Sequence, residues 1–174
     1  TIRSGKLPNI YCGILSVIAV PLFAANRSIS LRRRLAYLGL LGVLAASLVI
    51  NQFDLIWHGL HAPNDLPYRF SFLYSFVLLL IAYQTIINLG TITGKQIASS
   101  AAALIGWIIL IEKFGGDDYE FYSIYVSLLL VIIYAAVIGL ISLRKIETSP
   151  AYILLLIIVT TEMVFNTGSS FCML

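Results

Sequence analysis

Charged side chains are scarce in this chain: 11% of its 174 residues are charged, whereas 60% are hydrophobic. A soluble domain carries about 25% charged residues, so this chain has too little polar side chain to cover a surface that faces water. The net charge is only +3 and the basic residues are spread out, so we expect no nucleic-acid partner. Cysteine is also rare, and Cys12 and Cys172 are too few for a disulfide framework. These shortages exclude a water-soluble domain and indicate a membrane protein.

Six apolar runs can each form a membrane-spanning helix, some of them only with their flanks. Crossing the hydrocarbon takes about 20 mostly apolar residues. The runs lack the strict alternation of barrel strands, and unpaired amides cannot face lipid, so helix is the expected conformation. The sequence therefore predicts an all-α polytopic transmembrane helical bundle of about six helices, forming a single domain over residues 1–174. The expected helices are 9–25, 35–53, 69–89, 96–111, 121–143 and 151–167.

Basic residues in the loops predict the orientation of the bundle. The first, third and fifth loops hold seven Lys or Arg residues, whereas the second and fourth hold only Arg69 and Lys113. Positive residues stay on the cytoplasmic side, so we expect both chain ends outside. The chain starts at Thr1 on that outer side without a signal peptide, so we expect an internal piece of a longer membrane protein. The seven residues are Arg27, Arg32, Arg33, Arg34, Lys95, Arg144 and Lys145.

The second loop concentrates side chains that suit proton transfer, metal binding or anion binding. It holds both histidines of the chain, and Asp54, His58 and His61 stand at i, i+4 and i+7. If this stretch is helical, the three share one face. They could hold a divalent metal, form an acid/base relay, or make a hydrogen-bonded cluster that ties the loop to the helix ends. The sequence therefore assigns no cofactor and leaves a divalent metal as one of three alternatives.

Three further polar residues stand at helix ends or within apolar runs. Arg69 opens the third run beside aromatic residues, where it could pair with a phosphate or act as a snorkelling anchor. Glu162 lies in the sixth run with Asn166 four residues on and therefore on the same face. A charge at membrane depth is costly, so we predict that Glu162 faces protein or a wet cavity. The alternative is that it reaches the interface from near the outer end of its helix.

Several stretches resemble the bacterial YfhO family of membrane proteins. The resemblance lies in Leu7-Pro8-Asn9-Ile10-Tyr11-Cys12-Gly13 and in Asp54…Trp57-His58-Gly59…Pro63-Asn64…Pro67-Tyr68-Arg69-Phe70-Ser71-Phe72. The string from Pro63 to Phe72 is its most specific part, because hydrophobicity alone would not produce that order of rare residue types. Glu162 and Asn166 are also similar to the family, less specifically.

This resemblance implies a multi-pass protein of the bacterial plasma membrane, related to the glycosyltransferase C superfamily. Those enzymes move a sugar from a polyprenyl-phosphate carrier to an acceptor outside the membrane, which in Gram-positive bacteria is associated with lipoteichoic acid. The implied partners are membrane lipid and a polyprenyl-phosphate-linked sugar donor. The family's catalytic acid lies in a first outer loop that we expect to precede this chain, so no residue here is assigned to catalysis. The substrate-binding candidates are Arg69, His58, His61, Asp54 and Asn64.

Two other functions stay open at this point. A transporter or flippase segment would favour inverted repeats and broken helices, and the sequence has one run interrupted by Pro21 and no repeat. A membrane scaffold segment would carry no chemistry of its own. Sugar transfer by the purified full-length protein would separate the three functions.

Overall fold

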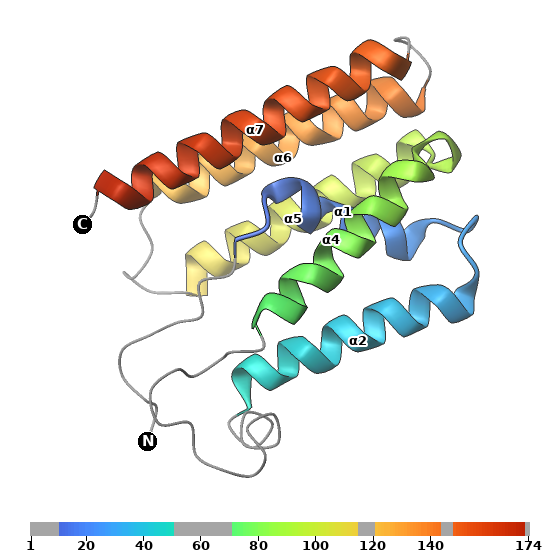
Figure 1. The fold of residues 1–174 in the computed structure, drawn as a ribbon, viewed down its shortest axis with the longest axis horizontal. Coiled ribbons are helices and arrows are strands. Elements are labelled where there is room, and N and C mark those ends of the chain that lie inside the picture. Colours follow the sequence, from blue (N-terminus) through green and yellow to red (C-terminus); the bar gives the residue numbers. More distant parts are fainter. Residues whose placement is uncertain (1–10, 51–70, 115–120, 144–147, 173–174) are drawn as a thin grey trace.

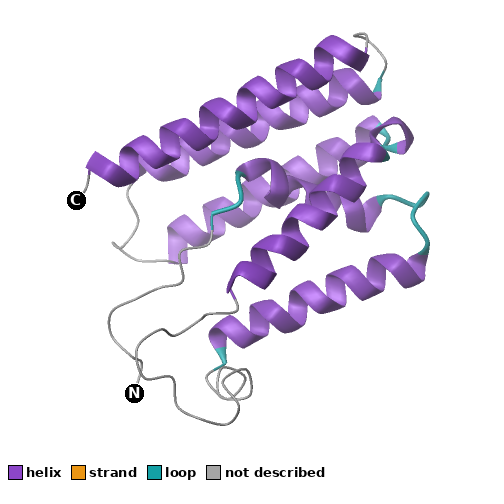
Figure 2. Cartoon of the chain, viewed as in Figure 1, coloured by secondary structure: helices purple, strands orange, loops and turns teal. Residues whose placement is uncertain are grey.

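The computed structural model describes residues 11–50, 71–114, 121–143 and 148–172. Within these ranges the chain is helical and contains no strand, as Figure 2 shows, which confirms the predicted all-α class. Each described α-helix overlaps one of the six predicted runs. The elements are α1 (Ile14–Ala25), α2 (Leu31–Val49), α4 (Ser71–Ile87), the short 3-10 helix η1 (Leu89–Thr91), α5 (Gly94–Phe114), α6 (Phe121–Ser142) and α7 (Thr148–Cys172).

One shift of a boundary concerns the basic residues at the start of α2. We expected this helix to begin at residue 35, after a loop that holds Arg32, Arg33 and Arg34. The helix instead begins at Leu31, with Ser30 as its N-cap residue, so the three arginines form its first turn. Arginine is a good helix former, and its long side chain carries the charge away from the helix axis. Three of the four arginines assigned to the first loop therefore lie at the start of α2 instead, and Arg27 remains in the loop.

Within the described ranges, three helices are long and apolar enough to cross a membrane, by length and composition: Gly94–Phe114, Tyr122–Ser142 and Ser149–Thr167. Ile14–Ala25 and Ser71–Ile87 are shorter apolar helices. The 12 residues of α1 rise only about 18 Å, whereas the hydrocarbon is about 30 Å thick. One end of α1 therefore lies inside the bilayer when the neighbouring helices span it. Which side the chain ends face stays a prediction.

Successive helices run in opposite directions (Figure 1). The end of α1 lies with the start of α2, and the end of α4 with the start of α5, at one end of the bundle, on the right in the figure. The end of α2, the start of α4 and the end of α7 lie at the other end, whereas the short α1 starts nearer the middle of the bundle. The first and third predicted loops are therefore at the same end of the bundle, as an alternating topology requires.

The middle of the bundle is occupied by α1, which packs against α4, α5 and α6 (Figure 1). Its residues Ile18 and Leu22 are fully buried in one apolar cluster that includes Val131 and Ile138 of α6. Phe23 is fully buried in a second cluster, with residues of α2 and α4. Close side-chain packing of this kind holds helices together in lipid, where the hydrophobic effect between them is weak.

The C-terminal end of α1 is held by side chains from other helices. Gln96 Nε2 of α5 donates to the carbonyl of Ala25 at 2.6 Å, and Arg34 Nη1 of α2 donates to the carbonyl of Ala24 at 2.7 Å. Carbonyls in the last turn of a helix have no partner within the helix, and cationic donors also suit the negative end of its dipole. This end of α1 is therefore fixed by polar contacts. The backbone amides at the opposite end of α1 also need hydrogen-bond partners from outside the helix.

Candidate functional site

The first turn of α1 has amide groups that need acceptors from outside the helix. The N-cap residue is Gly13, which is buried, has φ = 77° and offers no side chain to the helix. The amide of Ile14 instead donates to Glu162 Oε1 at 2.8 Å. A carboxylate from α7 thus lies at the positive end of the α1 dipole, which favours an anion.

Glu162 is only 5% exposed and accepts two further hydrogen bonds. The Tyr11 hydroxyl donates to Oε1 at 2.6 Å, and the Tyr134 hydroxyl donates to Oε2 at 2.5 Å. All three described donors are uncharged: two are tyrosine hydroxyls and one is a backbone amide. We call Glu162, Tyr11, Tyr134 and the Ile14 amide the Glu162 cluster. It joins α7, α6 and the start of α1.

The Glu162 cluster lies within the candidate membrane spans. Tyr134 is fully buried near the middle of the candidate span Tyr122–Ser142, and Glu162 itself belongs to the candidate span Ser149–Thr167. When these spans cross the bilayer, the non-helical backbone just before Ile14 also lies at membrane depth. Irregular backbone inside a membrane is tolerated only where protein covers it or where it lines a cavity.

Gly13 fits this place for two reasons. Its positive φ is unfavourable for residues with a side chain. A Cβ built there would also lie 3.2 Å from Met163 Cε and 3.5 Å from Glu162 Oε2. The glycine therefore lets α7 approach the start of α1 closely enough for the Ile14 hydrogen bond.

Beside the Glu162 cluster lies a cavity of about 670 Å³, between α6, α7 and the start of α1. Its walls are mainly apolar, with Val126 and Ile133 on α6 and Ile158 on α7. Tyr11 and Glu162 contribute polar groups to the same lining. This volume falls within the range of about 300–1,000 Å³ that is usual for ligand pockets. We call it the α6–α7 cavity.

A family model described as bacterial membrane protein YfhO matches residues 1–173. The chain belongs to this family. No curated protein and no solved structure matches it. Two of the stretches that resemble YfhO proteins meet in the Glu162 cluster, because Tyr11 and Gly13 come from the first and Glu162 from the last.

The sequence prediction for Glu162 matches its position, since its side chain is buried among protein groups rather than exposed to lipid. Asn166, predicted on the same helix face, lines the α6–α7 cavity together with Glu162. The other predicted site residues of this YfhO protein lie outside the described residues, so their clustering stays a prediction. These are Asp54, His58, His61, Asn64 and Arg69.

The predicted metal alternative also rests on those residues. In the part of the chain that the structure describes, no group of three or more His, Cys, Asp or Glu side chains could hold a metal ion. The Glu162 cluster has one carboxylate with hydroxyl and amide donors around it, which is a poor set of metal ligands because the donors present hydrogens.

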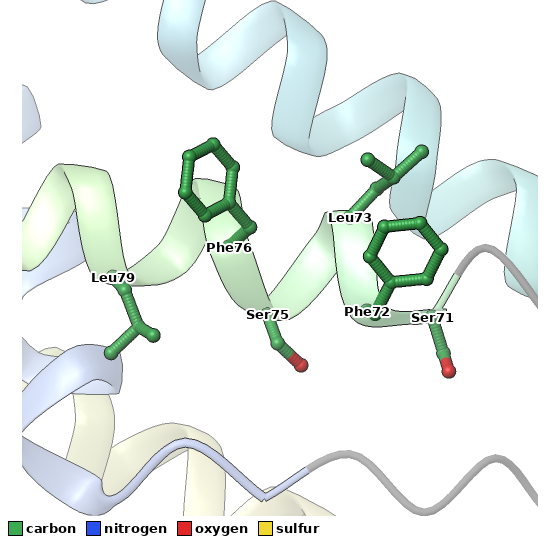
Figure 3. Close-up of a pocket in the computed structure, with 6 residues that line it drawn as sticks. All are labelled: Ser71, Phe72, Leu73, Ser75, Phe76 and Leu79. Atoms are coloured by element: carbon green, nitrogen blue, oxygen red, sulfur yellow. The ribbon is translucent and has the colours of Figure 1, made fainter.

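A second hollow lies on α4, immediately after the polar second loop (Figure 3). It is open, and all its lining residues come from this one helix. Phe72 and Phe76 are more than half exposed there, at 67% and 56%. The side chains diverge along the helix and do not converge on a common point in Figure 3, so this surface is a weaker candidate than the α6–α7 cavity.

Sequence reasoning assigned no role to Tyr11, Gly13 or Tyr134. One indication was present for Tyr134, because a tyrosine in the middle of an apolar run needs a partner for its hydroxyl. Tyr11 and Gly13 stood in a stretch similar to YfhO proteins, but nothing local connects them with a residue near the other end of the chain.

Proposed function

We propose that this chain is part of a YfhO-type enzyme that transfers a sugar from a polyprenyl-phosphate carrier to an acceptor on the outer face of the bacterial plasma membrane. Lipoteichoic acid is the acceptor class that the family resemblance implies. The observation that carries the proposal is the Glu162 cluster, a polar centre at membrane depth beside the α6–α7 cavity, in a chain that matches the YfhO family over residues 1–173.

The cavity supports an enzyme of lipid-linked substrates for a physical reason. Two candidate membrane spans form its walls, so an isoprenoid or acyl chain could enter from the bilayer without crossing water. The end of α2 and the start of α4, which flank the second loop, lie at the end of the bundle where α7 also ends (Figure 1). The α6–α7 cavity would then bind the lipid tail, and the second loop would bind the polar head.

In the proposed reaction the acceptor hydroxyl attacks the anomeric carbon of the sugar and polyprenyl phosphate leaves. A carboxylate accepts the hydroxyl proton as the new bond forms. No residue of this chain is assigned as that base. Arg69 would hold the leaving phosphate, because a guanidinium can make two parallel hydrogen bonds to it. Asp54, His58, His61 and Asn64 would shape the pocket around the sugar.

The test uses the intact protein in lipid nanodiscs and a polyprenyl-phosphate sugar with different isotopic labels on sugar and lipid. Sugar transfer separates the two labels, one reaching the acceptor and the other remaining on polyprenyl phosphate. Heat-inactivated protein is the control. If the labels never separate across a panel of sugars with lipoteichoic acid present, sugar transfer is ruled out.

A transporter function is the second candidate, because an ionisable residue inside a membrane span is typical of ion and proton pathways. Glu162, which is buried in Ser149–Thr167, is such a residue. The doubly labelled donor also distinguishes this case when the protein is in sealed vesicles. A flippase would move both labels together across the membrane with the glycosidic bond intact.

A further inference from the structure

We propose that the α6–α7 cavity binds an uncharged membrane lipid with a free hydroxyl headgroup, such as a diacylglycerol, and that its hydroxyl donates a hydrogen bond to Glu162. The site is separate from the proposed phosphate contact at Arg69. Its link to sugar transfer, as a site for the lipid part of an acceptor, rests on the proposed function, whereas the binding itself does not.

The source of the ligand follows from the walls of the cavity. Val126, Ile133 and Ile158 give it an apolar surface, and the helices that carry them are candidate membrane spans. A cavity between two such helices exchanges with the bilayer rather than with water. Its occupant is therefore a molecule that already resides in the membrane and places a hydrocarbon chain along α6 and α7.

The charge of the lining selects against phosphate headgroups. Glu162 is the one charged side chain among the described residues that line the cavity, and no Lys or Arg is among them. Two negative charges in a medium of low dielectric repel each other strongly. A phospholipid head next to Glu162 would need a cation that this lining does not offer, whereas an uncharged head has no such requirement.

The hydrogen-bonding capacity of Glu162 selects a donor. Oε1 already accepts from the Tyr11 hydroxyl and the Ile14 amide, and Oε2 accepts from the Tyr134 hydroxyl. A carboxylate has about four acceptor positions, so the described residues leave one position, on Oε2. Because Glu162 lines the cavity, that position can receive the O–H of a ligand.

Two other hydroxyl groups of the lining also present acceptors. Ser127 Oγ donates to the carbonyl of Ser123, and Thr161 Oγ1 donates to the carbonyl of Ile157, each at 2.8 Å. Their hydrogens are thus used within their own helices, and their oxygen lone pairs remain for a ligand. Both residues line the α6–α7 cavity. Ser127, Thr161 and Glu162 thus offer acceptors to a headgroup with hydroxyl donors, and Tyr122, Ser123 and Asn166 add further polar groups to the lining.

The test is photocrosslinking of a diacylglycerol probe to the intact protein in phosphatidylcholine nanodiscs, with the labelled peptides located by mass spectrometry. We expect saturable labelling of α6 and α7 that unlabelled diacylglycerol blocks. Phosphatidic acid with the same chains should block it at least roughly tenfold less well, since a hydrogen bond to a charged group contributes about a factor of ten or more to affinity. Equal blocking by phosphatidic acid would overturn the proposal.

Two neighbouring isoleucines offer a matched pair of variants that leave Glu162 intact. Ile133 lines the cavity, whereas Ile132 is 55% exposed and is not in the lining. Ile133→Phe should fill part of the cavity and reduce labelling several-fold, while Ile132→Phe should label like the unchanged protein. Equal labelling of the two variants would locate the lipid elsewhere and overturn the site.

Two further outcomes are decisive. If an amine-headed phospholipid displaces the probe better than diacylglycerol does, Glu162 selects an ammonium group and the hydroxyl assignment is wrong. Because no sugar donor is present, a failure of binding is separate from a failure of sugar transfer. Saturable labelling in a protein that shows no transfer would support the site and remove only its link to the acceptor.

Discussion

The Tyr11 hydroxyl donates a 2.6 Å hydrogen bond to Glu162 Oε1, across 151 positions of the sequence. The same oxygen accepts from the Ile14 amide, so one carboxylate of α7 holds both the residue before α1 and the first turn of α1. Because α1 is too short to span the bilayer, this contact satisfies backbone that would otherwise lie unpaired at membrane depth. The first three predictions test the hydrogen bonds of Glu162 and the close approach of α7 to the start of α1.

Replacing Glu162 should destabilise the protein because its three donors lose their acceptor. Each buried donor left unpaired costs about 1–3 kcal/mol. We expect Glu162→Leu to lower the midpoint of thermal unfolding in detergent markedly, and Glu162→Gln, which keeps one carbonyl oxygen, to lower it less. Glu112→Gln, near the end of α5, is the control and should change little. Unfolding of Glu162→Leu at the temperature of the unchanged protein would show that the carboxylate is dispensable for folding.

Tyr134→Phe removes one hydroxyl and keeps the ring. Tyr134 is fully buried and donates to Glu162, whereas Tyr152 is 40% exposed on α7. A hydrogen bond to a charged group contributes about 1.5–3 kcal/mol, so Tyr134→Phe should lose stability of that order in denaturant titrations. The matched variant Tyr152→Phe should be nearly neutral. Equal losses for the two variants would mean that the Tyr134 hydroxyl adds nothing specific.

Gly13→Ala should be destabilising because the backbone there has φ = 77° and the new Cβ approaches Met163 Cε. Strain of this kind costs about 1–3 kcal/mol. Gly106→Ala is the matched control, since Gly106 lies within α5 and a Cβ there meets nothing within 4 Å. That change should be neutral or stabilise by about 0.5–1 kcal/mol, because alanine favours helix. Similar unfolding midpoints for the two variants would contradict the assigned role of Gly13.

The orientation predicted from the basic residues can be tested by cysteine labelling in whole cells. Cysteines at Asn64 and Asp117 should react with a membrane-impermeant thiol reagent, because the second and fourth loops are expected outside. A cysteine at Ser30, which precedes the arginines of α2, should react only after the cells are opened. The background of each experiment is a variant in which Cys12 and Cys172 are replaced by serine. Labelling of Ser30→Cys in intact cells would reverse the topology.

Arg69 should contribute to binding of the donor's phosphate. A charged hydrogen bond is worth about 1.5–3 kcal/mol, so Arg69→Ala should weaken donor affinity roughly tenfold to a hundredfold. Arg69→Lys should lose much of the effect, because an ammonium lacks the two parallel donors of a guanidinium. Donor titrations of the intact protein measure both. Unchanged affinity in Arg69→Ala, with a normal yield of folded protein, would leave Arg69 as a structural anchor.

The sequence by itself determined the class of this protein and the course of its helices. Long apolar runs and few charges leave only membrane helices, because backbone groups in lipid must pair within their own segment. The helices in the structure follow those runs, and α2 begins four residues earlier than predicted, where arginines are compatible with a helix end. The cost of a charge in lipid also predicted that Glu162 faces protein or water rather than lipid.

Only the tertiary structure decided what Glu162 contacts. A helix such as α6 is apolar on all sides, so its sequence does not show which face meets protein and which meets lipid. Tyr134 and Glu162 lie on different helices, and Tyr11 lies near the opposite end of the chain, so no local spacing relates them. Their meeting depends on the short α1 being placed in the middle of the bundle, where its first amide needs an acceptor that only a neighbouring helix can supply.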